Sequence, residues 1–352
     1  MKSSKILIAL NEQKNCQWRI AKRPNGNVKD DDFLYDETEI PTIENGEILL
    51  KTLYLNIAPV MRMYMSGDSV ANEKSLDIGD VIHGRGVAEV IESKHPNYKV
   101  GEIHQGQIGW QTFKKSKVTP AEKFRKIEDY RLPYSIGLST LGMTGFSAYF
   151  GLLDCGKPKE NETVVVSGAA GGVGTNVVQL AKIYGCRVIG IAGSDQKCEL
   201  IKKLGCDGVI NYKKDNVRSS IETLCADGID IYFDNVGGEI LTICLDNLAK
   251  KSRVVLCGSI SEYLNDKPFG PTNYTKLRKT NSLMQGFFVY NYEDQFHIAE
   301  KNLARWVQEK KIRPIEHMFD GFINMPKALA SIYEGKNSGV AMCRIRKGPY
   351  EN

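Results

Sequence analysis

The sequence predicts an α/β fold with two modules, an antiparallel β-barrel and a doubly wound parallel sheet. The first observation behind this prediction is a length of 352 residues, 42% hydrophobic and 25% charged, which suits two domains with cores of their own. Up to about residue 130, short β-rich segments alternate with turn signals, and no helical pattern separates them. From residue 132 onward, helices alternate with apolar strands, as in a parallel sheet that is covered on both faces.

The change in the predicted secondary-structure pattern along the chain predicts the domain boundaries. Residues 1–131 are expected to form the barrel, and residues 132–311 the parallel-sheet domain. Residues 312–352 return to mixed texture, and we expect them to rejoin the barrel. The parallel-sheet domain is then an insertion in the other domain, with a cleft between the two.

In the first module the pattern predicts strands at residues 47–56, 86–93 and 107–113. Residues 22–32 are expected to form an exposed loop. The apolar run at residues 6–10 is too short for the core of a signal peptide, so it predicts one more strand.

In the second module the strands read as apolar along their whole length, which predicts burial on both faces. We expect strands at residues 163–167, 187–192, 208–212, 229–234, 253–257 and 284–290. We expect helices at residues 174–184, 196–204, 217–226, 239–250 and 293–310.

Composition narrows the function classes. The 47 basic and 42 acidic residues are scattered and leave a net charge of +5, which gives nucleic-acid binding no support. The nine cysteines are odd in number, widely spaced and nowhere in a Cys-x-x-Cys motif, which argues against structural zinc and against a disulfide framework. No stretch approaches the roughly 18 uncharged apolar residues of a membrane span. We therefore expect a cytoplasmic protein without a membrane or nucleic-acid partner.

The strongest local signal is the run SGAAGGVG at residues 167–174, between the strand TVVVS and a helix. Small residues let the backbone pass close to a pyrophosphate, and the following helix offers it N-terminal amides and a positive dipole end. The spacing Ala169-x-Gly171-x-x-Gly174 replaces the strict three-glycine form. In this strand–turn–helix context the run predicts a dinucleotide site. The alternative is a glycine turn that serves only close packing of helix on strand.

The end of the next strand favours NADP over NAD. An NAD site usually has an acid there to bind the ribose hydroxyls, whereas this chain has Gly193. Asp195 follows two residues later and is expected to cap the next helix. Gly193 leaves room for a 2′-phosphate, to which Ser194 could donate a hydrogen bond and Lys197 a charge. The alternative for Lys197 is a solvated lysine like Lys202 on the same helix.

With these residues in view, the chain resembles the zinc-independent branch of the medium-chain dehydrogenase/reductase superfamily. The nearest group is the leukotriene B4 12-hydroxydehydrogenase/prostaglandin reductase family, which includes plant double-bond reductases and curcumin-reductase-like enzymes of bacteria. Weaker similarity at residues 59–62 and 84–93 extends the resemblance over nearly the whole chain. The segments that carry it are GMTGFSAYFGL at 142–152, the glycine turn, AGSDQK at 192–197, NYK at 211–213, FDNVGG at 233–238, CGSISEY at 257–263 and GKNSG at 335–339.

The resemblance implies an NADPH-dependent reductase of the carbon–carbon double bond in α,β-unsaturated ketones or aldehydes. It implies a GroES-like barrel, a Rossmann domain and a homodimer joined near residues 287–290. It assigns the pyrophosphate to the glycine turn, the 2′-phosphate to Lys197 and Tyr212, and the nicotinamide to residues 257–263, with Met143 as a further lining candidate. The cofactor-binding residues expected from the motifs and the resemblance together are Gly171, Gly172, Val173, Gly174, Ser194, Lys197, Tyr212, Asn235, Cys257, Gly258, Ser259, Ile260, Tyr263, Phe287, Phe288, Val289 and Asn337. Without the family resemblance, an equally good interpretation of Asn235 is a turn residue whose hydrogen bonds are made within the protein. Residues 287–289 would equally well be an apolar strand with no role in cofactor binding.

Two features of the first module bear on substrate and metal. The family commonly has Asp-Pro-Tyr-Met-Arg where this chain has Ala-Pro-Val-Met-Arg at residues 58–62, so Val60 removes an aromatic group from the pocket. The zinc-dependent relatives carry Gly-His-Glu, a cysteine ligand in the barrel and a four-cysteine lobe. Here no acid follows His83, and Cys16 is the only cysteine in the first 150 residues. One imidazole without neighbours makes no metal site, so we expect none and take His83 as a packing residue.

Tyr263 is the candidate catalytic residue. Hydride delivery to the β-carbon of an enone leaves negative charge on the carbonyl oxygen, and a hydrogen-bond donor at that oxygen lowers the barrier. Tyr263 lies in the loop after the fifth strand, at the sheet edge where ligands collect, and either its hydroxyl or the cofactor's ribose hydroxyl would donate. The alternative is that Tyr263 only packs beside the nicotinamide. Tyr64 and Trp110 are candidate pocket walls, although a place in the buried core is the stronger explanation of each.

Two other functions stay open at this point. One is an NADPH:quinone reductase of the same fold. Comparing the turnover of a quinone with that of an alkenal distinguishes it from the double-bond reductase. The other is a non-enzymatic NADPH-binding protein, structural or RNA-binding, which a complete lack of NADPH oxidation on a panel of enones would favour.

Overall fold

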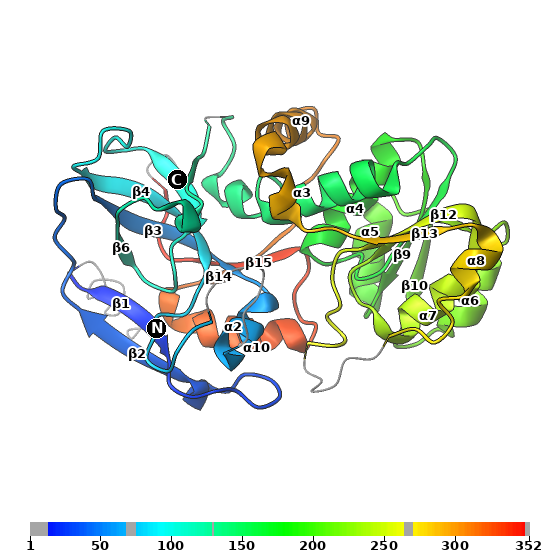
Figure 1. Ribbon diagram of the computed structural model, residues 1–352, viewed down its shortest axis with the longest axis horizontal. Helices are drawn as coiled ribbons and strands as arrows, with labels where there is room; N and C mark the ends of the chain where they lie inside the picture. Colours follow the sequence, from blue (N-terminus) through cyan, green and yellow to red (C-terminus); the bar gives the residue numbers. More distant parts are fainter. Residues whose placement is uncertain (1–12, 68–74, 129, 264–269, 349–352) are drawn as a thin grey trace. The chain divides into compact units, whose positions relative to one another are not determined.

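The structure is a computed structural model that describes residues 13–67, 75–128, 130–263 and 270–348. The chain divides into two compact units, each with its own sheet (Figure 1). Of the described residues, those within 13–138, 317–336 and 341–348 belong to the first unit, and those within 139–316 and 337–340 belong to the second. The strand expected at residues 6–10 lies outside the described residues.

The second unit is built on a six-stranded sheet in which every pair of neighbours is parallel. In chain order the strands are β8 (Thr163–Val166), β9 (Arg187–Ala192), β10 (Gly208–Asn211), β11 (Ile229–Asp234), β12 (Leu248–Leu256) and β13 (Leu283–Gly286). Their order in space is β10-β9-β8-β11-β12-β13, so the direction of winding reverses between β8 and β11. Ligands of doubly wound sheets bind at the carboxyl ends of the strands that flank such a reversal.

Helices cover both faces of this sheet. They are α3 (Met143–Phe150), a π-helix (Gly151–Gly156), α4 (Gly172–Ile183), α5 (Asp195–Lys203), α6 (Val217–Leu224), α7 (Gly238–Asp246), α8 (Lys276–Thr280), the 3-10 helix η5 (Val289–Gln295) and α9 (Phe296–Gln308). Val165 of β8 pairs with Ile189 of β9 and with Tyr232 of β11, and these three side chains share one buried cluster with α6 and α7. Gly190 faces the other way, since a side chain there would meet Ile201 of α5.

The first unit is built on a seven-stranded sheet in the order β14-β15-β3-β4-β5-β7, with β6 also paired to β3. Its strands are β3 (Ile48–Ile57), β4 (Arg85–Ser93), β5 (Ile103–Gln107), β6 (Phe113–Ser116), β7 (Arg125–Lys126), β14 (Glu316–Asp320) and β15 (Val340–Arg344). The pairs from β15 to β7, and the pair of β3 with β6, are antiparallel. A separate antiparallel pair is formed by β1 (Asn15–Ile20) and β2 (Phe33–Thr38).

Two short α-helices complete the core of the first unit, and one-turn helices connect its strands. The α-helices are α2 (Val60–Ser66) and α10 (Met325–Tyr333), which bury Met65 and Leu329 in the same cluster as Trp110. The 3-10 helices are η1 (Asp30–Asp32), η2 (Pro120–Glu122), η3 (Tyr134–Leu138) and η6 (Phe322–Asn324). Within the described ranges, no helix is long and apolar enough to span a bilayer.

The predicted fold class is confirmed, and β9 and β11 have the predicted bounds. The strand predicted at residues 107–113 is wrong, because Gly109 turns the chain into a left-handed conformation (φ +78°) between β5 and β6. In the predicted loop at residues 22–32, Val28 and Asp32 are buried rather than exposed. The strand pair β1 and β2 was not expected from the sequence.

In the second unit two predicted elements end early. The strand predicted at residues 284–290 stops at Gly286, and the ring of the next residue, Phe287, fills the space that a Cβ atom on Gly151 would need. The helix predicted at residues 239–250 stops at Asp246, because Leu248 already pairs with β11 as the first residue of β12.

Candidate active site

The glycine turn joins the carboxyl end of β8 to the first turn of α4. Gly171 donates its N–H to the carbonyl oxygen of Gly168 at 2.9 Å, and Gly168 has φ +57°. A Cβ atom at Gly174 would lie 2.7 Å from the Cα atom of Ala169, so close packing of helix on strand does require this glycine. Gly171 is the residue that precedes α4 and has no side chain to cap the helix. The first-turn amides of α4 can therefore bind an anion.

Residues 337–340, from the last part of the described chain, return to this turn. Gly339 donates its N–H to the carbonyl oxygen of Ala170 at 2.7 Å, and Gly339 and Gly171 form a parallel bridge. The amide of Asn337 donates to the carbonyl oxygen of Gly339 at 3.2 Å. The structure thus brings Asn337, which is 163 positions beyond Gly174 in the printed sequence, into the same unit as the glycine turn.

The carboxyl ends of β9 and β10 lie side by side. Gly193 follows β9, and a Cβ atom there would lie 2.8 Å from the hydroxyl oxygen of Tyr212, which follows β10. Ser194 precedes α5 and accepts a hydrogen bond from the backbone N–H of Lys197 at 3.3 Å. The prediction that Asp195 caps this helix is wrong, because Ser194 has the extended backbone of a capping residue and Asp195 is already helical.

Asp195 is engaged by its own neighbours. Its carboxylate accepts a hydrogen bond from the side-chain amide of Asn211 at 2.7 Å and forms an ion pair with Lys214. The only acid in the AGSDQK segment is therefore held by two other side chains of the second unit.

Lys197 differs from the other lysines of α5. It is half-buried, whereas Lys202 and Lys203 are exposed. Burial and the nearby charge of Lys213 lower the pKa of Lys197. The ammonium of Lys213 lies 6.0 Å from the centre of the Tyr212 ring. Lys213 thus lies near both Lys197 and the Tyr212 ring, and an anion bound between the two lysines would relieve their repulsion.

Lys213 is a residue that the sequence reasoning missed. The available signal was its position, directly after Tyr212 in the NYK segment that carries the family resemblance.

A buried carboxylate organises the point where the sheet reverses its winding. Asp234, the last residue of β11, is 1% exposed. Its Oδ1 atom accepts hydrogen bonds from the hydroxyls of Ser167 (2.8 Å) and Tyr232 (2.7 Å) and from the N–H groups of Val236 and Gly237 (3.0 Å each). Sequence reasoning missed Asp234 too, although an acid at the end of an apolar strand was visible in the FDNVGG segment.

The loop after β12 is tied to the same residue. Cys257 and Gly258 donate their N–H groups to the backbone oxygen of Asp234 at 2.9 and 3.1 Å. Burial and the nearby Asp234 raise the pKa of the Cys257 thiol to about 12, so it is protonated at neutral pH. Ile260 donates its N–H to the backbone oxygen of Asn235 at 3.4 Å, which ties the middle of the loop to the β11–α7 turn.

Tyr263 is half-buried at the end of this loop. Its hydroxyl oxygen lies 3.6 Å from the position that a Cβ atom of Gly258 would take. Burial raises the pKa of Tyr263, while hydrogen bonding with Ser259 opposes that effect. The hydroxyl therefore keeps its proton at neutral pH and is able to donate it in a hydrogen bond.

Asn235 serves the turn itself. Its side-chain amide donates to the backbone oxygen of Ser167 at 2.8 Å, and its backbone N–H donates to the Ser167 hydroxyl at 2.9 Å. These bonds join the ends of β8 and β11. The alternative stated for Asn235, a turn residue whose side chain is hydrogen-bonded within the protein, therefore describes its amide group.

Phe287, Phe288 and Val289 do not form a strand, contrary to the prediction. Phe287 packs on Gly151, the ring centre of Phe288 lies 5.0 Å from that of Tyr290, and Val289 begins η5. A contact of these three residues with a cofactor stays a prediction.

In the first unit the aromatic candidates are core residues. Trp110 is fully buried and its ring stacks on Phe33 with centres 5.8 Å apart. Tyr64 is buried, and its ring meets His83 edge-on at 5.4 Å. Val60 packs against the same core. Within the part of the chain that the structure describes, no three His, Cys, Asp or Glu side chains are grouped to hold a metal ion.

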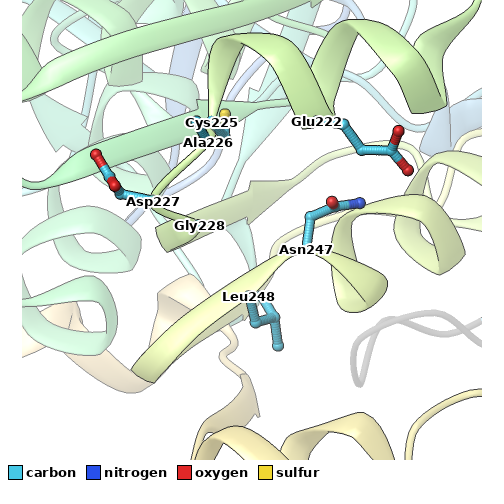
Figure 2. Close-up of a pocket in the computed structure, with 7 residues that line it drawn as sticks. All are labelled: Glu222, Cys225, Ala226, Asp227, Gly228, Asn247 and Leu248. Atoms are coloured by element: carbon cyan, nitrogen blue, oxygen red, sulfur yellow. The ribbon is translucent and has the colours of Figure 1, made fainter.

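A shallow pocket of about 370 Å³ lies elsewhere on the second unit (Figure 2). It is lined by residues at the end of α6 and by Gly228 and Leu248, which stand at the amino ends of β11 and β12. Because the glycine turn and Tyr212 follow carboxyl ends of strands, this pocket is at the opposite edge of the parallel sheet and is not the candidate dinucleotide site.

Comparison with known proteins agrees with this arrangement. Residues 16–127 match the family described as the N-terminal domain of oxidoreductase, and residues 172–306 match the family described as zinc-binding dehydrogenase. The NADPH-dependent curcumin reductase of Escherichia coli is 36% identical over 341 residues, which cover 95% of this chain and 98% of that protein. Prostaglandin reductase 1 of Bos taurus is 38% identical over 330 residues, which cover 93% and 98%.

A solved structure shares both fold and sequence with the chain. CurA from Vibrio vulnificus in complex with NADPH superposes with a TM-score of 0.88 at 35% identity, covering 94% of this chain and 99% of that one. These similarities extend over both units and confirm the resemblance inferred from the motifs. The chain belongs to the leukotriene B4 12-hydroxydehydrogenase/prostaglandin reductase family, in the zinc-independent branch of the medium-chain dehydrogenases/reductases.

Proposed function

We propose that this chain reduces the carbon–carbon double bond of α,β-unsaturated ketones or aldehydes, with NADPH as the hydride donor. The observation that carries the proposal is the similarity over nearly the whole chain to an NADPH-dependent curcumin reductase, combined with the glycine turn and with the Tyr212 ring packed over Gly193. Curcumin contains α,β-unsaturated ketones, which belong to the substrate class that the family resemblance implies. The chain is therefore an NADP-dependent oxidoreductase that acts on a small conjugated molecule.

The residues at the sheet edge fit this cofactor. The uncapped first turn of α4 and residues 171–174 would hold the pyrophosphate. Ser194, Lys197 and Tyr212 would bind the 2′-phosphate, because Lys197 and Lys213 lie near each other and Asp195, the acid of that segment, is engaged by Asn211. Residues 257–260, with Asn235 and Asn337, would line the remaining length of the dinucleotide.

Tyr263 is proposed to assist the chemistry. Bound NADPH supplies a hydride to the β-carbon of the substrate. Negative charge then develops on the carbonyl oxygen, and a protonated hydroxyl placed near it lowers the barrier. The enolate then takes a proton at its α-carbon from an acid or from water, which gives the saturated product. Tyr263 keeps its proton, because burial raises its pKa, and it lies against Gly258 in the loop proposed to line the nicotinamide.

A substrate panel tests the proposed function. The purified chain is assayed with an alkenal, an acyclic enone, the matching saturated ketone and a quinone, each with NADPH and with NADH, and the products are identified. We expect saturated aldehyde or ketone from the first two substrates, no turnover of the saturated ketone, and a strong preference for NADPH. Faster turnover of the quinone would favour a quinone reductase, and no oxidation of NADPH with any substrate would favour a non-enzymatic binding protein.

We also propose a homodimer and a cytoplasmic location. β13 is the last strand of its sheet and Leu283 on it is 53% exposed, and such an edge is usually covered. The edge strand comprises Leu283–Gly286 rather than the expected residues 287–290. Sedimentation equilibrium of the wild-type chain over a range of concentrations tests the dimer. None of the nine cysteines, all of which lie in the described residues, forms a disulfide, which suits a reducing compartment.

A further inference from the structure

A short segment near the chain terminus is hydrogen-bonded into the dinucleotide turn. We call residues 337–340 the C-terminal strap. Two successive N–H groups of the strap donate to two different segments: Gly339 to the carbonyl oxygen of Ala170 at 2.7 Å, and Val340 to the carbonyl oxygen of Ile315 at 2.9 Å. The strap therefore lies between the glycine turn and the segment that precedes β14.

The segment beneath the strap is itself anchored to α4. The side-chain amide of Gln179, a buried residue of α4, donates to the backbone oxygen of Arg313 at 3.1 Å and accepts from the Arg313 N–H at 2.7 Å. Hydrogen bonds thus link α4 to residues 313–315, these residues to the strap, and the strap to the glycine turn, which leads back into α4. All of these segments belong to the second unit.

Glycine is required at the centre of the strap. Gly339 has φ +70°, and a Cβ atom there would lie 2.5 Å from the backbone carbonyl carbon of Ile315. Real Cβ atoms essentially never approach backbone so closely, so any side chain would push the strap away from Ile315 or from Ala170. Val340 packs equally closely on the other side, since a Cβ atom at Gly172 would lie 2.9 Å from its Cγ2 atom.

The strap fixes the orientation of one peptide group in the turn. The carbonyl oxygen of the Ala170–Gly171 peptide accepts from Gly339, and its N–H donates to Gly168 at 2.9 Å. With both polar groups engaged, this peptide cannot rotate without loss of two hydrogen bonds. Its orientation determines where α4 begins, and hence where the uncapped amides proposed to bind the pyrophosphate point.

We propose that the C-terminal strap positions the dinucleotide turn for cofactor binding and that Gly339 is the positioning residue. The inference rests on the proposed cofactor site at residues 171–174. Because the strap is bonded to the turn, a cofactor that stabilises the turn also stabilises the strap, and this coupling is reciprocal.

The first experiment compares two glycine substitutions in the full-length enzyme. Gly339→Ala introduces a left-handed alanine and a backbone collision. Gly335→Ala introduces a left-handed alanine (φ +67°) where no described atom lies within 4 Å of the new Cβ, so it controls for backbone strain alone. We expect Gly339→Ala to raise the KM for NADPH about tenfold or more while kcat falls less than about threefold, and Gly335→Ala to change either value less than about twofold.

NADH extends this comparison. Because the pyrophosphate is common to both cofactors, Gly339→Ala should weaken NADH binding by the same factor as NADPH binding, and the ratio of the two should stay constant. A change in the KM for NADPH no larger than that of Gly335→Ala would overturn the inference, and so would a selective loss of NADPH alone.

The second experiment needs no variant and applies even if Gly339→Ala does not fold. Amide hydrogen exchange is measured on the wild-type chain with and without saturating NADPH. We expect slower exchange in peptides that cover residues 168–174 and in the peptide that covers the strap. Protection of the glycine turn without protection of the strap would refute the inference and leave the proposed cofactor site standing. No protection at residues 168–174 would refute that cofactor site instead.

Discussion

The ring of Tyr212 occupies the space that a side chain at Gly193 would need. A Cβ atom on Gly193 would lie 2.8 Å from both the hydroxyl oxygen and the Cε1 atom of Tyr212. In NAD-binding domains the corresponding strand end holds an acid that binds the adenosine ribose. Here the neighbouring strand fills that position with a phenol, with Lys197 and Lys213 nearby. We therefore expect the preference for NADPH to arise from packing as well as from charge.

This packing predicts the result of a cofactor-switching substitution. Gly193→Asp alone should impair both cofactors, because the new carboxylate collides with Tyr212 and also repels the 2′-phosphate. The double variant Gly193→Asp/Tyr212→Ala removes the collision and should recover NADH turnover to within about tenfold of its wild-type level or better, while NADPH turnover stays low. Steady-state kcat/KM values for both cofactors check this, and a single variant that already used NADH well would contradict it.

Lys197 is predicted to carry NADPH selectivity through its charge. Loss of a charge-assisted hydrogen bond costs about 1.5–3 kcal/mol, so Lys197→Gln should weaken NADPH binding about 10- to 100-fold and leave NADH binding within about twofold. Lys202→Gln, at an exposed position on the same helix, is the matched control and should bind both cofactors normally. Equilibrium binding followed by nicotinamide fluorescence measures the effect. Equal weakening of NADH would show that the variant had lost more than the phosphate contact.

The affinity for NADPH should also depend on pH through Lys197. Burial and Lys213 lower the pKa of this ammonium, so it loses its proton at a lower pH than an exposed lysine. A bound phosphate favours the charged form, and binding therefore weakens as pH rises through the lowered pKa. We expect this alkaline weakening for NADPH with the wild-type chain, and its absence for NADH and for Lys197→Gln. If the affinity of Lys197→Gln for NADPH fell in the same way at alkaline pH, the titrating group would be a residue other than Lys197.

Tyr263→Phe should separate chemistry from cofactor binding. If the hydroxyl stabilises developing charge on the substrate oxygen, kcat for an enone falls about tenfold or more while the dissociation constant of NADPH changes little. Tyr274→Phe, at a tyrosine that is 60% exposed in the same unit, is the control and should leave kcat unchanged. Unchanged turnover in Tyr263→Phe would leave this residue a packing role beside the nicotinamide.

Asp234 is predicted to be the residue of the site whose loss costs most stability. Asp234→Ala leaves the two hydroxyls and two N–H groups that now bond to Oδ1 without their acceptor, so the free energy of unfolding should fall by about 3 kcal/mol. Asp234→Asn keeps an oxygen acceptor and should lose about 1 kcal/mol. Urea unfolding measures both. An equal loss in the two variants would show that the charge, and not the accepted hydrogen bonds, stabilises this point of the sheet.

The elements that sequence reasoning placed correctly are those with a strong local pattern. The apolar runs of β9 and β11 predicted those strands to the residue, and SGAAGGVG predicted a turn between a strand and a helix. The predictions that failed depended either on a contact with a distant segment or on the backbone conformation of a single residue. Phe287 leaves the strand pattern and packs on Gly151, whereas the 107–113 run breaks at a left-handed Gly109.

The same division holds for the site. Residues 167–174 and the missing acid at Gly193 can be read from a few consecutive letters, because turn geometry and helix dipoles depend on local chain. Three contacts of the site join segments that are distant in the sequence: the hydrogen bonds to Asp234, the packing of the Tyr212 ring over Gly193, and the hydrogen bond from Gly339 to Ala170. These segments meet only because of the order of strands in the sheet and because residues 337–340 return to the glycine turn. Local sequence specifies which backbone can form a turn, whereas hydrogen bonds between distant segments exist only once packing has placed their donors and acceptors within reach.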